Sequence, residues 1–142
     1  MVNLAKFNLL EKSCVSCTKC SLSKERINVV FGRGNPKAKI LIIGEGPGQQ
    51  EDEQGLAFVG RAGKMLDKSF LSVGIDTNMD CYISNIVKCR PPKNRKPKNN
   101  EVENCITWLS DQIELINPKI IVLAGSTAVQ SYLNINQPIS KI

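Results

Sequence analysis

The stretch of residues 39–64 constrains the fold of this chain more than any other. It opens with four apolar residues at 40–43, a pattern typical of a strand covered on both faces in a parallel sheet. The turn that follows contains three glycines, a proline and an acid: Gly44, Glu45, Gly46, Pro47 and Gly48. Because α/β folds bind ligands in loops at the carboxyl ends of parallel strands, Glu45 is a candidate site residue. The alternative is an ordinary strand-to-helix turn.

The rest of the chain alternates between patterns typical of helices and of buried strands. Helical patterns cover residues 3–12, 61–73, 100–116 and 126–133, and apolar strand patterns cover 81–87 and 120–123. Asn100 and Glu103 resemble a capping box at the start of the third helix. The alternation predicts an open parallel sheet with helices on both faces, in which the three strand ends share one edge.

Length and composition limit the class of protein. A chain of 142 residues fits one domain, so we expect a single unit over residues 1–142. No apolar run reaches the length of a membrane helix, and residues 1–12 lack the order of a signal peptide, which favours a cytoplasmic monomer without membrane contact. The absence of histidine excludes an imidazole base, acid or metal ligand within these residues.

The positive charge is concentrated in one loop. The formal net charge is +6, and six basic residues lie within 88–98, where there is no acid. They are Lys88, Arg90, Lys93, Arg95, Lys96 and Lys98. Three prolines in the same stretch stiffen it, which favours a phosphate-facing surface over an ordinary solvated face.

The six cysteines suggest a metal site. Cys14, Cys17 and Cys20 form two overlapping C-x-x-C pairs, and Cys105 follows Cys89 by 16 positions. One pair together with the two distant cysteines could supply four thiolates. Spacing alone leaves Zn²⁺, an iron-sulfur cluster and unligated buried cysteines open, and it does not decide which pair takes part.

Asn85 lies near the end of the second predicted strand. A buried amide there must find hydrogen-bond partners or lower the stability of the fold. It is therefore bonded to neighbouring backbone or directed into a pocket.

Two long motifs resemble the family 4, or iron-sulfur, uracil-DNA glycosylases. They are GEGPGQQEDEQGLAFVGRAGKMLD and YISNIVKCRPPKNRKP, followed by Cys105 at the matching distance. The resemblance extends from about Cys17 to the end of the chain. It implies a three-layer α/β/α fold with a central parallel sheet and hydrolysis of the N-glycosidic bond of deoxyuridine in DNA during base excision repair.

The same resemblance implies particular residue roles. Cys17, Cys20, Cys89 and Cys105 would hold a structural 4Fe-4S cluster. The substrate contacts would come from Glu45, Gly46, Pro47, Glu51, Phe58 and Asn85, with Glu45 and Asn85 as the catalytic pair. Phe58 would stack on an extruded uracil, Asn85 would read its edge, and the basic loop would contact the DNA backbone.

The family carries a further segment with a His-Pro motif, whose histidine stabilises the departing uracil. This sequence ends at Ile142, before that segment, so we expect either a shortened member or a fragment, or crippled catalysis. The loss of one such donor lowers the rate by about 10²–10³-fold. The alternative is a non-catalytic iron-sulfur DNA-binding module. A nucleotide-binding protein ranks last, because the glycine turn lacks both GxGxxG spacing and a Walker lysine.

Overall fold

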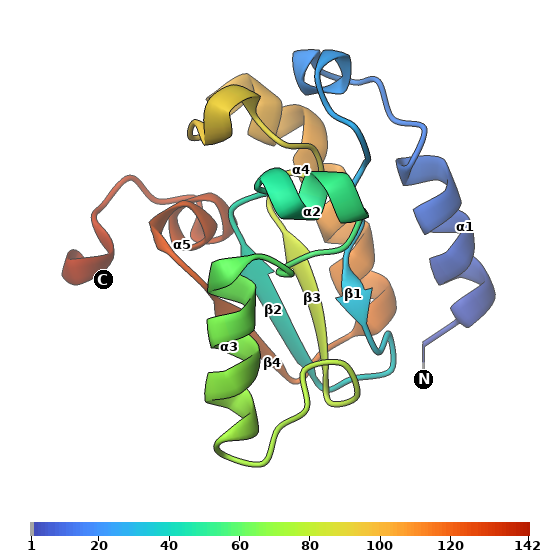
Figure 1. The fold of residues 1–142 in the computed structure, drawn as a ribbon, viewed down its shortest axis with the longest axis vertical. Coiled ribbons are helices and arrows are strands. Elements are labelled where there is room, and N and C mark those ends of the chain that lie inside the picture. The colour runs from blue at the N-terminus through green and yellow to red at the C-terminus, as the bar shows by residue number, and fades with distance from the viewer. Residues whose placement is uncertain (1) are drawn as a thin grey trace.

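The computed structural model describes residues 2–142, which form a sheet between two layers of helices (Figure 1). The α-helices are α1 (Leu4–Cys14), α2 (Gln49–Gln54), α3 (Arg61–Leu71), α4 (Asn99–Ile116) and α5 (Ser126–Leu133). The strands are β1 (Arg33–Gly34), β2 (Ile40–Gly44), β3 (Cys81–Asn85) and β4 (Ile120–Leu123). Short 3₁₀ turns occupy η1 (Ser21–Lys24), η2 (Pro92–Asn94) and η3 (Ile139–Lys141). The predicted three-layer α/β class is confirmed.

The sheet has the strand order β1-β3-β2-β4. The central strand β2 pairs in parallel with β3 and β4, and Ile42 lies opposite both Ile83 and Val122. The strands β2 and β3 point to the same end of the molecule, where the basic loop and α2 lie (Figure 1). The prediction that the strand ends share one edge is confirmed.

One strand departs from the prediction of a purely parallel sheet. Arg33 and Gly34 form β1, which pairs with β3 in the antiparallel direction. The sequence suggested an extended piece a few residues earlier, at 29–31. Those three residues are buried without entering the sheet.

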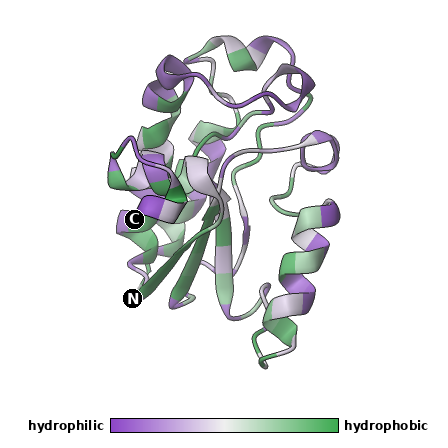
Figure 2. Cartoon of the chain, turned by 90° about the vertical axis from the view of Figure 1, so that its left-hand side faces the viewer, coloured by the Kyte–Doolittle hydropathy of each residue, from purple (hydrophilic) through white to green (hydrophobic). Residues whose placement is uncertain are grey.

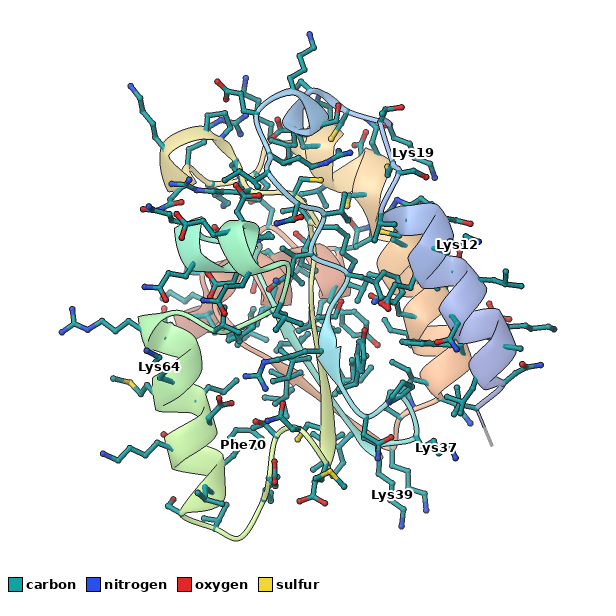
Figure 3. All side chains as sticks on the ribbon, turned by 45° about the vertical axis from the view of Figure 1, so that its right-hand side comes forward. Lys12, Lys19, Lys37, Lys39, Lys64 and Phe70 are labelled. Atoms are coloured by element: carbon teal, nitrogen blue, oxygen red, sulfur yellow. The ribbon has the colours of Figure 1, made fainter. Side chains whose placement is uncertain are left out.

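Alternation along the strands divides the core between the two faces. Leu41, Ile43 and Tyr82 pack with α1 and α4 on one face. Ile42 and Ile83 pack on the opposite face with apolar residues of α3, including Phe70, which lies between α3 and the sheet (Figure 3). The strands are consequently hydrophobic on both faces, whereas the loops at their ends are largely hydrophilic (Figure 2).

The start of α4 corrects the predicted capping box. The helix begins at Asn99, and the carboxylate that caps it belongs to Glu101, which accepts from the Lys98 backbone N–H at 2.8 Å. Glu103 is exposed, whereas Glu101 is fully buried. Within residues 2–142, no helix has the length and apolar character needed to cross a membrane.

Candidate functional site

The carboxyl ends of β2 and β3 build the floor of the candidate site. Gly44 lies opposite Asn85 in the parallel register. Beyond the strands, the Ile86 N–H donates to the Gly44 carbonyl at 2.9 Å, and the Val87 N–H donates to the Glu45 carbonyl at 3.1 Å. The glycine turn and the segment after Asn85 are therefore held together by their own backbones.

Asn85 carries a buried side-chain hydrogen-bond acceptor that has no donor among the described residues. Its side chain is 2 % exposed, and its Oδ1 atom is the one buried side-chain polar atom without a hydrogen-bond partner among residues 2–142. Native proteins satisfy most such atoms, so an unpaired acceptor at a strand end suggests a ligand-binding role. The sequence left two possibilities for this amide: bonding to neighbouring backbone, or pointing into a pocket. The described part of the chain offers no backbone partner for Oδ1.

Phe58 lies beside this acceptor. A Cβ atom added to Gly44 would stand 2.4 Å from Phe58 Cζ and 2.7 Å from Asn85 Oδ1. The ring and the amide therefore converge on the space above Gly44. We call Gly44, Phe58 and Asn85 the slot.

Two residues hold the backbone of Phe58 in place. Phe58 has a φ of +54°, which is uncommon for a residue with a side chain. Arg33 donates to the Ala57 carbonyl at 2.6 Å and to the Phe58 carbonyl at 3.0 Å, and it also pairs with Asp67 at 2.8 Å. At Gly63, an added Cβ would stand only 1.9 Å from the Phe58 carbonyl oxygen, so the turn requires glycine there.

Glu51 joins the glycine turn to the loop that carries Phe58. Its carboxylate accepts from the backbone N–H groups of Gly48 at 3.0 Å, Val59 at 2.9 Å and Gly60 at 2.6 Å. The resemblance assigns Glu51 to substrate binding. In the structure, this carboxylate shapes the walls of the slot.

The Glu45 side chain takes a different direction from that of Asn85. Its Oε2 atom accepts a 2.6 Å hydrogen bond from the hydroxyl of Thr127 on α5, and the side chain is exposed. The structure thus brings the Glu45 backbone to the slot and anchors its carboxylate on α5. Gly46 packs against Val87, where an added Cβ would approach Cγ2 to 2.7 Å, and Pro47 is buried beside it.

For one residue of the basic loop, the predicted contact with DNA is wrong. Lys88 was predicted to face DNA, but its side chain is 1 % exposed, so it cannot form part of the protein surface. Its ammonium donates to the Ser84 hydroxyl, to the Asn85 carbonyl at 2.8 Å and to Gln112 Oε1 at 2.7 Å. Burial lowers the pKa of Lys88 to about 8. Nothing in the sequence singles out Gln112, because a polar residue on a helix usually faces water.

Arg95 is also bound, through its guanidinium, to another side chain of the protein. Its guanidinium forms two hydrogen bonds with the Glu101 carboxylate, at 2.7 and 2.8 Å. Glu101 further accepts from the Ser21 hydroxyl at 3.3 Å, which ties the segment after Cys20 to the basic loop. Lys93, Lys96 and Lys98 are exposed, and Arg90 is partly so.

The cysteines predicted to bind metal come together from distant parts of the chain. Cys89 and Cys105 are buried, while Cys17 and Cys20 are partly exposed. Burial raises the pKa of Cys105, and the neighbouring thiols of Cys20 and Cys17 raise it further. Cys14 lies in the same neighbourhood and is completely buried, with a pKa raised by burial to about 12. We call these five residues the cysteine region.

N–H donors point at three of these sulfurs. The Trp108 indole donates to Cys17 at 3.4 Å, Arg26 donates to Cys89 at 3.6 Å, and the Lys88 backbone N–H donates to Cys105 at 3.2 Å. The Lys19 ammonium lies 4.4 Å from the centre of the Trp108 ring, at the outer side of this region (Figure 3). Such donors stabilise thiolates, so the donor set suits a group bound by several cysteines.

The cysteine region contains no preformed site for a single ion. Within residues 2–142, no three His, Cys, Asp or Glu side chains lie close enough to hold one metal ion. Four cysteine thiolates suit both Zn²⁺ and an iron-sulfur cluster.

The structure is an α/β domain whose candidate ligand-binding residues lie at the carboxyl edge of the sheet. Comparison with known proteins gives the family. Residues 31–141 match the model of the uracil DNA glycosylase superfamily, and the chain belongs to that superfamily.

Several named relatives are similar to this chain in sequence. The chain is 46 % identical over 124 residues to the type-4 uracil-DNA glycosylase of Archaeoglobus fulgidus, covering 87 % of this chain and 62 % of the relative. It is 48 % identical over 118 residues to the type-4 enzyme of Thermotoga maritima, covering 83 % and 61 %. A type-5 uracil-DNA glycosylase of Pyrobaculum aerophilum is 31 % identical over 116 residues, covering 72 % and 51 %. The chain thus spans about three-fifths of the length of the two type-4 relatives, and the resemblance to family 4 is confirmed.

Proposed function

We propose that this chain acts as a type-4 uracil-DNA glycosylase, which hydrolyses the N-glycosidic bond of deoxyuridine in DNA and releases uracil. The observation that carries the proposal is the buried, unpaired Oδ1 atom of Asn85 beside the Phe58 ring. An extruded pyrimidine would supply the missing donor. The similarity to two type-4 enzymes supports the same activity.

Recognition of uracil would combine stacking with hydrogen bonding. Uracil inside a duplex is out of reach, so it must first be flipped out of the helix. The Phe58 ring would stack on any flat base, and stacking alone does not select uracil. The Asn85 amide can accept from the N3–H group of uracil and donate to O4. Cytosine reverses that pattern and would leave buried groups unpaired.

Bond cleavage places positive charge on the sugar and negative charge on the departing base. Backbone N–H groups of the glycine turn would stabilise the negative charge. The Glu45 carboxylate, anchored by Thr127, would support the positive charge or orient the attacking water. Glu51 would act indirectly, by holding the turn and the Phe58 loop in register.

Cys17, Cys20, Cys89 and Cys105 would bind the 4Fe-4S cluster. When bound, the cluster would link the N-terminal segment to the basic loop and to α4, as a structural element rather than a redox centre. We expect a brown protein with about four irons per chain. A colourless preparation with stoichiometric zinc would contradict this assignment.

The exposed cations of the basic loop would contact DNA phosphates. Replacing Lys93 or Lys96 with alanine should weaken binding to all sequences and reduce the slope of log K against log salt by about 0.7–0.9. Arg95→Ala should reduce this slope by less than Lys93→Ala or Lys96→Ala does, because the Arg95 guanidinium is already paired with Glu101.

The deciding assay measures abasic-site formation in a uracil-containing oligonucleotide, read by alkali cleavage. Asn85→Ala should lower turnover by about 10²-fold or more. Asn104→Ala, on the exposed face of α4, is the matched control and should behave like the unmodified protein. The proposal fails if excess protein with an intact cluster forms no product. Salt-sensitive DNA binding independent of Glu45 and Asn85 would then support the non-catalytic DNA-binding module.

A further inference from the structure

Lys88 is the most unusual buried group outside the proposed chemistry. Its ammonium lies between the end of β3 and the C-terminal part of α4, completely enclosed. Each of its three N–H groups has a partner: the Ser84 hydroxyl, the Asn85 carbonyl and Gln112 Oε1. All three acceptors are neutral, and no ion pair to Lys88 occurs within residues 2–142. The position of the ammonium is therefore set by three hydrogen bonds.

Such a group is costly to keep. Enclosing a cation without a carboxylate partner carries a desolvation penalty, which hydrogen bonds to neutral acceptors must offset. The hydrogen-bonding geometry of the ammonium suggests a role beyond stability.

The partners of Lys88 connect it to the slot. The carbonyl that it binds belongs to Asn85, the residue whose side chain carries the unpaired acceptor. Gln112, which accepts from the ammonium, donates in turn to the Phe31 carbonyl at 2.8 Å. This second bond fixes the amide of Gln112. The Asn85 peptide is thus braced from α4 through Lys88.

The partners also connect Lys88 to the cysteine region. Its backbone N–H donates to Cys105 Sγ at 3.2 Å, and the next residue is Cys89. One residue therefore touches both the peptide that carries the base-reading amide and a cysteine proposed to bind the cluster.

We propose that Lys88 is a positioning residue, whose buried ammonium holds the Asn85 peptide and so aims the Asn85 amide at the uracil edge. This inference rests on the proposed function of the slot. The mechanism is geometric: the ammonium fixes the carbonyl of Asn85, the carbonyl fixes the peptide plane, and the plane limits the directions open to the side chain. The contribution is to selectivity, because general DNA affinity comes from the exposed cations of the basic loop.

The test replaces Lys88 with methionine, which has a similar length and no N–H donor. Discrimination between uracil- and cytosine-containing single strands should fall by about 10–100-fold, the range of a hydrogen bond to a charged group. Affinity for undamaged DNA and iron content should stay the same. Ser84→Ala is the matched control, because it leaves the ammonium bonded to Asn85 and Gln112, and it should keep the discrimination. Gln112→Met removes the tie between the ammonium and α4, so it should give an intermediate loss, and it serves if Lys88→Met does not fold.

A second measurement separates this inference from the proposed function. The side-chain amide resonances of Asn85, recorded without DNA, should shift in Lys88→Met and stay in place in Ser84→Ala. If the unmodified protein shows no uracil preference, the proposed function fails while the resonances still report on positioning. Unchanged Asn85 resonances in Lys88→Met, or undiminished discrimination in a protein that does prefer uracil, would overturn the role of Lys88.

Discussion

The slot and the cysteine region are assembled in opposite ways. The walls of the slot are fixed by many hydrogen bonds within the polypeptide, through the carboxylate of Glu51 and the guanidinium of Arg33. In the cysteine region, three sulfurs accept hydrogen bonds from only a few N–H groups, and no three thiols lie close enough to hold a single ion within residues 2–142. The difference teaches that hydrogen bonds within the chain fix the first region, whereas the geometry of the second would depend on the cluster that we propose it binds.

The largest expected effect comes from removing a proposed cluster ligand. Cys89→Ser should abolish iron binding and lower the free energy of unfolding by more than about 5 kcal/mol, because binding of a structural metal group contributes directly to folding. Iron analysis and urea unfolding measure both effects. Under native conditions, hydrogen exchange should increase around Cys17 and Cys20, while the amides of Val59 and Gly60 remain protected.

Cys81→Ala is the matched control for this experiment. Cys81 is fully buried on the α3 side of the sheet, away from the other cysteines, so the variant should keep its iron. Equal iron loss in both variants, or loss of slot protection in Cys89→Ser alone, would show that the two regions are not assembled independently.

The slot should be sensitive to a single methyl group. In Gly44→Ala, the new Cβ would collide with Phe58 and approach Asn85 Oδ1 to 2.7 Å, so the ring must move. We expect uracil release to fall by about 10²-fold while the stability drops by only about 1–3 kcal/mol. Single-turnover kinetics and thermal unfolding provide the measurements, with binding to uracil-free DNA as the internal control. Full activity would mean that the space above Gly44 is not the base site.

Removing the brace of the slot should cost an intermediate amount of stability. Arg33→Met leaves the Ala57 and Phe58 carbonyls without their donor and Asp67 without its partner, so the free energy of unfolding should fall by about 3 kcal/mol. Arg61→Met, at the exposed start of α3, should change it by less than about 0.5 kcal/mol. Equal effects in urea unfolding would remove Arg33 as a determinant of the slot.

The smallest effect concerns the ion pair beside the cysteine region. The hydrogen bonds from Arg95 hold the pKa of Glu101 at about 2, below its ordinary value of 4.5. Because the folded-state pKa is depressed, the stabilisation is complete above pH 4.5 and disappears as the pH falls towards 2. The difference in unfolding free energy between the unmodified protein and Glu101→Gln should therefore shrink from pH 6 to pH 3. A difference independent of pH would contradict this role of the carboxylate.

Much of the fold could be predicted from the sequence because its signals are local. The apolar run before the glycine turn, and the similar runs that become β3 and β4, mark buried parallel strands without any knowledge of their partners. The six-residue helix α2 and the two-residue strand β1 escaped prediction, since neither is long enough to show a period. The cap of α4 was placed two residues late because the partners of Glu101 lie outside the helix: Arg95 in the basic loop, and Ser21, which is 80 positions away.

The chain by itself determined the layered sheet, the meeting of the glycine turn with Asn85, and, through its long motifs, the superfamily. Only the tertiary structure decided how individual side chains are used. It buried Lys88, bound Arg95 to Glu101, directed Glu45 towards α5, and left Asn85 Oδ1 without a partner. The physical reason is that strand and helix patterns depend on neighbours in sequence, whereas the environment of a polar group depends on elements brought to it from tens of residues away.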